Sequence, residues 1–397
     1  MSTGWSPLLD ERDAAAAWEA IDAVASDLLR AAPGSATLAA GDAGIALFFH
    51  YLSREKRQPA PAPHLERAVA ALQHQELDAS LYTGFLGVAW TVEHLRGQDQ
   101  DLNQAVDEAL LGFLDDDQWA YPFDLVAGLV GMGVYALERG PRGARILRRI
   151  VELLGRTAER RDGRAAWRAA LELLPGDQIA SSSGYYNLGI AHGVGGVLAF
   201  LSFAKRAGSE VEPLLGETKR WLAERRGPLG GYPCLVDVTD LSGKQLRSAW
   251  CHGDPGLAAA WLASARAGAD GALEKEALRL ARGLAGLSAR ELGVNDAGLC
   301  HGAAGLGHLF NRLFQTTREP LFAAEARHWF RAALELRRPG SGVGGFVAAG
   351  VAEGDAVRWE SDPGFLTGAA GVGLALLAAA GSVEPAWDRA LLVSAHG

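Results

Sequence analysis

Two Cys-His pairs are the residues of this sequence best suited to bind a metal ion. The pairs are Cys251-His252 and Cys300-His301, and each lies directly before a glycine. Zinc favours thiolate sulfur and imidazole nitrogen in tetrahedral geometry, so these residue types point to that metal. Neighbouring residues do not share a helix face, which means that both members of a pair could reach one ion only from a turn. By itself, a Cys-His pair seen twice is a weak motif.

The glycines after these pairs belong to a Gly-x-x-Gly tetrad that occurs seven times in the chain. The tetrads begin at Gly41, Gly84, Gly128, Gly193, Gly253, Gly302 and Gly368, so that successive ones are 43 to 66 residues apart. An apolar run follows each tetrad, as in 197–206, and an amphipathic segment precedes it, as in 145–161. This pattern is typical of helix-pair repeats, in which amphipathic outer helices alternate with inner helices that are apolar nearly all round.

Seven inner and seven outer helices in alternation predict an all-α fold, an α/α toroid, in a single domain over residues 1–397. An open solenoid is the alternative, but neither end carries an obvious polar capping repeat, and we therefore favour a closed ring. Because a glycine inside a helix costs about 1 kcal/mol relative to alanine, the paired glycines need a structural reason. We expect them to permit close backbone approach where the N-termini of the inner helices converge.

The composition fits a globular protein with an ample core, since 49% of the residues are hydrophobic and 21% are charged. The net charge of −9 argues against nucleic acid as a partner, because that would require a basic cluster. Three cysteines cannot build a disulfide framework, and the N-terminus does not resemble a signal peptide, so we expect a cytoplasmic protein. The uncharged stretches 185–204 and 364–383 are long enough to cross a bilayer, but both contain a tetrad. We expect them to be buried helices, without stable membrane insertion.

The position directly before the tetrad concentrates chemically active side chains. In chain order it holds Ala40, Thr83, Ala127, His192, His252, His301 and Thr367. Three of the ten histidines therefore share one position of the repeat, and Cys251 and Cys300 come one residue earlier. If the repeats superpose, these side chains meet on one rim of the toroid, where they would form a zinc site. The third cysteine, Cys234, is expected to be a buried or loop thiol.

WCHGDPG at 250–256 and CHGAAG at 300–305, within a seven-fold Gly-x-x-Gly repeat, resemble the motifs of the LanC-like lanthipeptide (lanthionine) cyclases. The resemblance covers nearly the whole chain. It implies one Zn²⁺ per chain, held by Cys251, Cys300 and His301, with a fourth position open to water or to a substrate thiol.

The same resemblance implies three catalytic residues: His192 as general acid and base, Asp124 as the family's carboxylate, and Arg247 as the arginine near the metal. In the implied reaction, a zinc-activated cysteine thiolate of a dehydrated precursor peptide adds to dehydroalanine or dehydrobutyrine and closes a thioether ring. Asp124 would either orient His192 or pair with Arg247. Arg247 would either stabilise an enolate or form a structural ion pair. His252, beside Cys251, is a further residue of a type that can coordinate metals but is not one of the three implied ligands, and a dehydratase and an exporter are implied as further partners.

Three other functions remain open at this point. Protein prenyltransferase-type α/α barrels also hold one catalytic zinc that activates a thiol, but they use a carboxylate ligand. No aspartate lies beside Cys251 or Cys300 in the required way. A second kind of LanC-like protein adds glutathione to dehydrated residues, and a non-enzymatic alternative is a zinc-containing helical scaffold that binds peptides. Metal content does not separate these functions, whereas the products formed from a dehydrated peptide with and without glutathione do.

Overall fold

The computed structural model describes residues 4–32, 34–58, 63–97, 101–116, 119–169, 184–351 and 357–395. It is mostly helical, and the chain divides into two compact units. Unit 1 comprises Met1–Asp78, Thr83–Leu95 and Ala285–Trp387, whereas unit 2 comprises Ala79–Tyr82, Arg96–Leu284 and Asp388–Gly397. The single domain expected over residues 1–397 stays a prediction.

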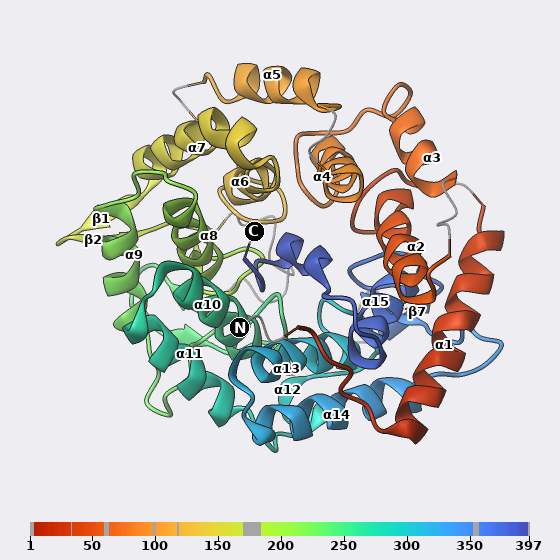
Figure 1. Ribbon diagram of the computed structural model, residues 1–397. Helices are drawn as coiled ribbons and strands as arrows, with labels where there is room; N and C mark the ends of the chain where they lie inside the picture. The colour runs from red at the N-terminus through yellow and green to blue at the C-terminus, as the bar shows by residue number, and fades with distance from the viewer. Residues whose placement is uncertain are drawn as a thin grey trace. The chain divides into compact units, whose positions relative to one another are not determined.

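In unit 1, helices that follow a tetrad alternate with amphipathic helices (Figure 1). The tetrad helices are α2 (Asp42–Lys56), α4 (Phe85–Arg96), α13 (Ala303–Thr317) and α15 (Ala369–Ala380). The remaining helices are α1 (Glu11–Arg30), α3 (Pro63–Ala71), α14 (Pro320–Glu335) and the single turn α12 (Ala289–Leu292). Helix α15 packs against α1, α2 and α13, while α13 also packs against α14.

Unit 2 repeats the same arrangement. Its tetrad helices are α6 (Leu129–Glu138), α8 (Val194–Arg206) and α10 (Asp254–Gly268). Its other helices are α5 (Gln104–Phe113), α7 (Ala144–Thr157), α9 (Leu214–Ala223) and α11 (Gly271–Gly283), with short 3₁₀ segments η1 (Gly140–Gly143) and η4 (Ala386–Leu391). Helix α8 packs against both α6 and α10, and α7, α9 and α11 pack against α6, α8 and α10 respectively. Every predicted helix pair is therefore present among the described residues.

Burial distinguishes the two kinds of helix. In α15 every residue from Ala369 to Ala379 is buried. In α7 only one stripe is buried, namely Ile146, Leu147, Ile150, Val151, Leu153 and Leu154. This difference agrees with inner helices that are surrounded by protein and outer helices that have one solvated face. Among the described residues, no helix is long and apolar enough to cross a bilayer.

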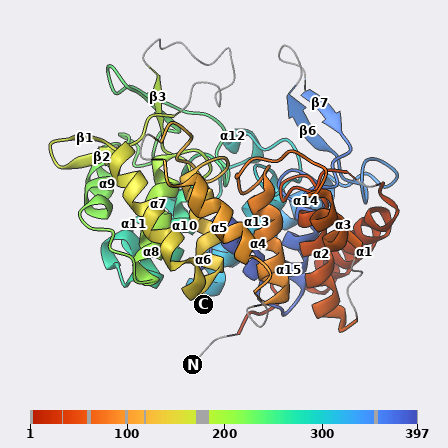
Figure 2. The same ribbon diagram turned by 90° about the horizontal axis from the view of Figure 1, so that it is seen from above.

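Three small antiparallel sheets, which the repeat pattern did not predict, lie in the connections. They consist of β1 (Glu159–Arg161) with β2 (Arg164–Ala166), of β3 (Tyr185–Asn187), β4 (Leu235–Asp237) and β5 (Gly243–Lys244), and of β6 (Ala348–Val351) with β7 (Val357–Glu360). The helix expected over 185–204 begins only at Val194, because β3 pairs with β4 and a loop follows. Figure 2 shows the β6–β7 hairpin standing out beyond α14 of the same unit.

A recurrent loop precedes the tetrad helices and caps their N-termini. The first-turn amides of a helix have no partner within the helix. Here they donate to carbonyl oxygens seven residues earlier: Asp42 to Ser35 at 2.9 Å, Leu129 to Pro122 at 3.2 Å, Ala303 to Asp296 at 2.9 Å and Ala369 to Asp362 at 2.9 Å. No side chain caps any of these four helices. The loop backbone therefore satisfies the amides and fixes the loop against the helix.

The second glycine of the tetrad lies against the same loop. In six repeats, a Cβ there would collide with the carbonyl oxygen six residues earlier: Gly44 with Leu38, Gly131 with Leu125, Gly196 with Ile190, Gly256 with Trp250, Gly305 with Leu299 and Gly371 with Phe365. The close backbone approach that we expected is therefore present. However, the nearest atom belongs in each case to the residue's own loop, and not to a converging neighbouring helix.

Helix α10 offers a matched test of this requirement for glycine. Gly256 lies in its first turn, whereas a Cβ on Gly268 at its end would meet nothing within 4 Å. Gly256→Ala should lower the free energy of unfolding by about 1–3 kcal/mol, because the methyl group overpacks the loop. Gly268→Ala should leave it unchanged or raise it by up to about 1 kcal/mol, because alanine favours a helix. Urea unfolding of the metal-free protein measures both, and equal stabilities would contradict this account.

Candidate active site

Three consecutive tetrad loops of unit 2 carry Asp124, His192 and Cys251. The backbones of these loops are hydrogen-bonded in a row. The amide of Leu125 donates to the carbonyl of Ala191 at 3.0 Å, and the amide of Ala191 donates to the carbonyl of Cys251 at 3.3 Å. Leu125 follows Asp124, and Ala191 precedes His192. The two hydrogen bonds therefore place Asp124, His192 and Cys251 in adjacent loops, although these residues are far apart in the sequence.

Asp124 and His192 form a hydrogen-bonded pair. Nδ1 of His192 lies 2.7 Å from Oδ2 of Asp124, and the other oxygen of Asp124 accepts the Ala127 amide at 2.8 Å. The Asp124 side chain is 2% exposed, whereas that of His192 is 22% exposed. A buried carboxylate that accepts the Nδ1 proton fixes the tautomer of the ring and leaves Nε2 for proton exchange. Of the two roles that the sequence left open for Asp124, the geometry favours orientation of His192.

Arg247 has an exposed side chain that pairs with none of the residues described. The guanidinium group makes no hydrogen bond or ion pair with another residue of the described ranges, so the structural ion pair considered from the sequence is not found there. The carbonyl oxygen of Arg247 accepts a weak hydrogen bond from Sγ of Cys234 at 3.8 Å. Cys234 is fully buried, as expected, and burial raises the pKa of its thiol to about 11. Cys234 therefore remains a protonated, structural thiol at neutral pH.

Cys251, Cys300 and His301 are the residues that we expect to hold a metal ion. Cys251 lies in the loop before α10 in unit 2, and Cys300 and His301 lie in the loop before α13 in unit 1. Cys251 is buried, and the other two residues are partly buried. His252 is not one of these three residues. Its ring centroid lies 6.3 Å from that of His192.

The donor set of this group fits zinc better than a hard cation. Two sulfurs and one imidazole nitrogen match the soft and borderline ligands that Zn²⁺ selects, whereas Mg²⁺ and Ca²⁺ require oxygen. Three protein ligands rather than four are typical of a catalytic zinc site, in which the last position is taken by water or substrate. The residues present therefore fit the metal that the sequence predicts.

Asp296 is a residue of this region that the sequence analysis missed. Its side chain is 1% exposed, and one oxygen lies 3.8 Å from Nε2 of His301. The signal was present in the repeat, because an Asp, Asn or Ser occurs six residues before the first tetrad glycine in five repeats. These residues are Ser35, Asp78, Asn187, Asp296 and Asp362. An alignment of the loops on their tetrads would have revealed this position.

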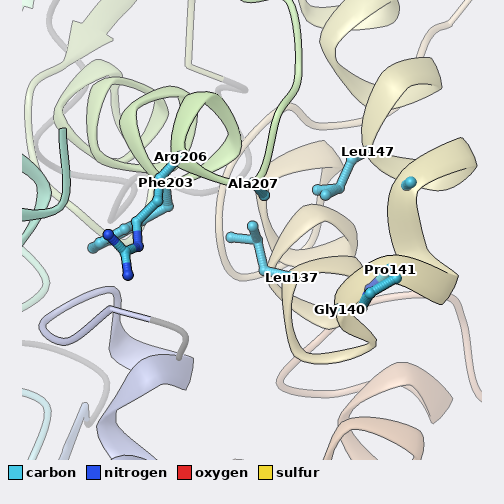
Figure 3. A pocket seen from close by; sticks show the side chains of 8 residues that line it. Leu137, Gly140, Pro141, Leu147, Phe203, Arg206 and Ala207 are labelled. Atoms are coloured by element: carbon cyan, nitrogen blue, oxygen red, sulfur yellow. The ribbon is translucent and has the colours of Figure 1, made fainter.

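A pocket of about 550 Å³ in unit 2 lies away from these loops (Figure 3). Its lining includes Leu137 near the C-terminal end of α6, together with Phe203 and Arg206 near the C-terminal end of α8. Asp124 and His192 instead precede the N-terminal ends of the same two helices. The pocket therefore takes no part in the candidate active site.

Comparison with known proteins gives consistent matches. The nisin biosynthesis protein NisC of Lactococcus lactis subsp. lactis is 25% identical over 327 residues, which cover 72% of this chain and 76% of that protein. Glutathione S-transferase LANCL1 of Danio rerio is 28% identical over 155 residues, covering 37% of this chain and 34% of that protein. A solved structure of nisin cyclase matches with a TM-score of 0.71 and 20% identity over 95% of this chain and 97% of the other.

The structural match confirms the fold class predicted from the repeat, a helical toroid of the LanC-like kind. The roles of the individual site residues stay predictions. A model of the family described as lanthionine synthetase C-like protein matches residues 32–392, which is most of the sequence. On this evidence, the chain belongs to the lanthionine synthetase C-like family.

Proposed function

We propose that this protein is a zinc-dependent lanthionine and methyllanthionine synthetase. It joins cysteine thiols of a dehydrated ribosomal peptide to dehydroalanine or dehydrobutyrine residues of the same peptide, and thioether rings result. The observation that carries the proposal is the repeated Cys-His motif, which puts Cys251 and Cys300 in equivalent positions of two tetrad loops, with His301 directly after Cys300. The family membership and the similarity to the nisin protein NisC support the choice of reaction.

Cys251, Cys300 and His301 would hold one zinc ion per chain. When bound there, zinc would supply a thiolate at neutral pH from a thiol in its open position, since a free cysteine has a pKa near 8.5.

The ring-closing step is an addition in which no atom is lost. The cysteine sulfur forms a bond to the β-carbon of the alkene, the alkene electron pair shifts to give an enolate, and a proton joins the α-carbon. His192 takes the thiol proton as base and returns a proton to the α-carbon as acid. Asp124 holds Nδ1 of His192 at 2.7 Å and stabilises the imidazolium between the two steps. Both proton transfers use Nε2.

Arg247 is the residue that we assign to the developing enolate. Its guanidinium is exposed and is not bound to another described residue, so it remains able to meet substrate. A cation placed at a developing oxyanion lowers the barrier more than it strengthens ground-state binding.

A glutathione-adding enzyme is the second candidate function. The 28% identity over 155 residues to glutathione S-transferase LANCL1 of Danio rerio favours it. The prenyltransferase alternative lacks this kind of support, because the metal-binding group contains no carboxylate. A peptide-binding scaffold, the third alternative, gives no reason for the buried Asp124–His192 pair.

We place the protein in the cytoplasm, where its three free cysteines would remain reduced. The dehydrated precursor peptide is its substrate. A dehydratase must act before it, because the alkene has to exist before a thiol can add. An exporter of the finished peptide is the further partner.

Metal and proton transfer should be separable by mutation. Cys300→Ala should lose the zinc, because two protein ligands no longer suffice, whereas His192→Ala should keep one zinc per chain. The His192 variant should form thioether about 10²–10⁴-fold more slowly, since only acid–base catalysis is removed. Elemental analysis and mass spectrometry measure the two effects. Cys234→Ala is the matched control and should retain its zinc. Undiminished zinc in Cys300→Ala would refute the ligand assignment.

Substrate choice distinguishes the two enzymatic candidates. A dehydrated peptide that keeps its cysteines is incubated with the protein, with and without glutathione. We expect the peptide thiols to become resistant to alkylation at the same rate in both reactions, because they add within the peptide. A glutathione adduct formed faster than the rings would favour the second candidate. If neither product forms, the protein is a scaffold.

A further inference from the structure

Three tetrad loops share a turn made by an Asp or Asn side chain. In each loop one side-chain oxygen accepts the amide two residues later. The distances are 2.8 Å for Asn187 and Gly189, 2.9 Å for Asp296 and Gly298, and 2.7 Å for Asp362 and Gly364. An amide and a carboxylate make this turn equally well, so the turn alone does not require an aspartate at any of the three positions.

The second oxygen of each aspartate has a different partner. In the last repeat, Oδ2 of Asp362 accepts a hydrogen bond from the hydroxyl of Thr367, the residue directly before the tetrad. In the preceding repeat, the same position is His301, and its Nε2 lies 3.8 Å from Oδ2 of Asp296. This oxygen also accepts the amide of Ala349 in β6 at 2.9 Å. Asp296 is therefore held by two amides from two segments of unit 1.

The Asp296 carboxylate is buried, and among the described residues His301 is the basic side chain that lies within 4.0 Å of it. Its side chain is 1% exposed, and the described part of the chain contains no Lys or Arg within 4.0 Å of it. A buried carboxylate is costly unless a hydrogen-bond donor or a positive charge compensates it. Two amides compensate part of this cost, and the imidazole N–H of His301 is the remaining donor in reach.

We propose that Asp296 is a positioning residue for His301, and this rests on the proposed function of His301 as a metal ligand. Oδ2 of Asp296 accepts the Nε2 proton and thereby directs Nδ1 to the metal. The two atoms lie 3.8 Å apart, which exceeds the usual hydrogen-bond range of about 2.7–3.2 Å, so the proposal requires a small rotation of the His301 ring toward Asp296. A carboxylate behind a metal-bound histidine fixes its tautomer and raises its basicity.

The repeat itself suggests why two histidines in equivalent positions differ in role. His192 has Asn187 in the turn, and its carboxylate comes from Asp124 in the preceding loop. His301 has its carboxylate in its own turn. The first arrangement contacts Nδ1 and leaves Nε2 for proton transfer, whereas the second contacts Nε2 and leaves Nδ1 for the metal.

Asp296→Asn, with Asp362→Asn as its matched control, tests the proposal. Both variants keep the turn oxygen and lose one negative charge. Competition with a chromophoric chelator at pH 7 should show zinc bound about 10–100-fold more weakly by Asp296→Asn, because the orienting carboxylate is gone. Asp362→Asn should bind zinc as tightly as the wild type. Thermal unfolding of metal-free Asp362→Asn should match the wild type. Metal-free Asp296→Asn should still unfold cooperatively, at a modestly lower temperature, because an asparagine cannot accept both the Gly298 and the Ala349 amides.

The tautomer of His301 in the wild type gives a second and independent readout. Long-range proton–nitrogen spectra of the ¹⁵N-histidine-labelled, zinc-loaded protein should show Nδ1 ligation with a proton on Nε2. Ligation through Nε2, or unchanged zinc affinity in Asp296→Asn, overturns the proposal. Neither readout uses cyclase activity. A wild type that binds zinc through Nδ1 yet forms no thioether would therefore refute the proposed function and leave the role of Asp296 intact.

Discussion

The amides at the start of each inner helix need hydrogen-bond partners where the surrounding protein excludes water. The loop before the helix supplies them, as when the amide of Ala303 donates to the carbonyl of Asp296 at 2.9 Å. The loop must fold tightly against the first turn to do so, and this leaves no room for a side chain on the tetrad glycine, as at Gly305. The residue directly before the tetrad is then placed in a similar way in these repeats. His192 and His301 occupy that position, and Cys251 and Cys300 come one residue before it in their repeats.

The two histidines directly before a tetrad differ in which ring nitrogen lies nearest to a buried carboxylate. His192 and His301 come from equivalent points of two repeats, and each lies near a carboxylate that is almost wholly buried. The carboxylate lies 2.7 Å from Nδ1 of His192 and 3.8 Å from Nε2 of His301. The proposed roles use the opposite nitrogen of each ring, for proton transfer in His192 and for the metal in His301.

Much of the fold could be predicted from the sequence, because its signals are local and repeated. The tetrads and the apolar runs behind them predict where inner helices such as α10 and α13 begin. The motifs around Cys251 and Cys300 predict the metal-binding group. The short strands were not predictable, since β3 has only three residues and is stabilised by pairing with a segment far along the chain.

The parts of the site that escaped prediction depend on contacts between distant segments. The sequence alone does not show whether Asp124 binds His192 or Arg247, because this depends on how two loops pack against each other. Asp296 was missed for a different reason. Its carboxylate lies near a histidine only five residues away, but it is also held by the Ala349 amide in β6, which comes much later in the chain.

If Cys251, Cys300 and His301 hold a zinc ion that directs ring formation, the ring pattern of the product should depend on these residues. A dehydrated peptide is incubated at pH 7 with the wild type and with Cys251→Ala, and the rings are mapped by tandem mass spectrometry and chiral analysis. We predict one ring pattern and one diastereomer from the wild type, because thiol and alkene are held together and one face is protonated. Cys251→Ala should give slow, mixed rings. The same pattern and the same single diastereomer from both proteins would contradict the account.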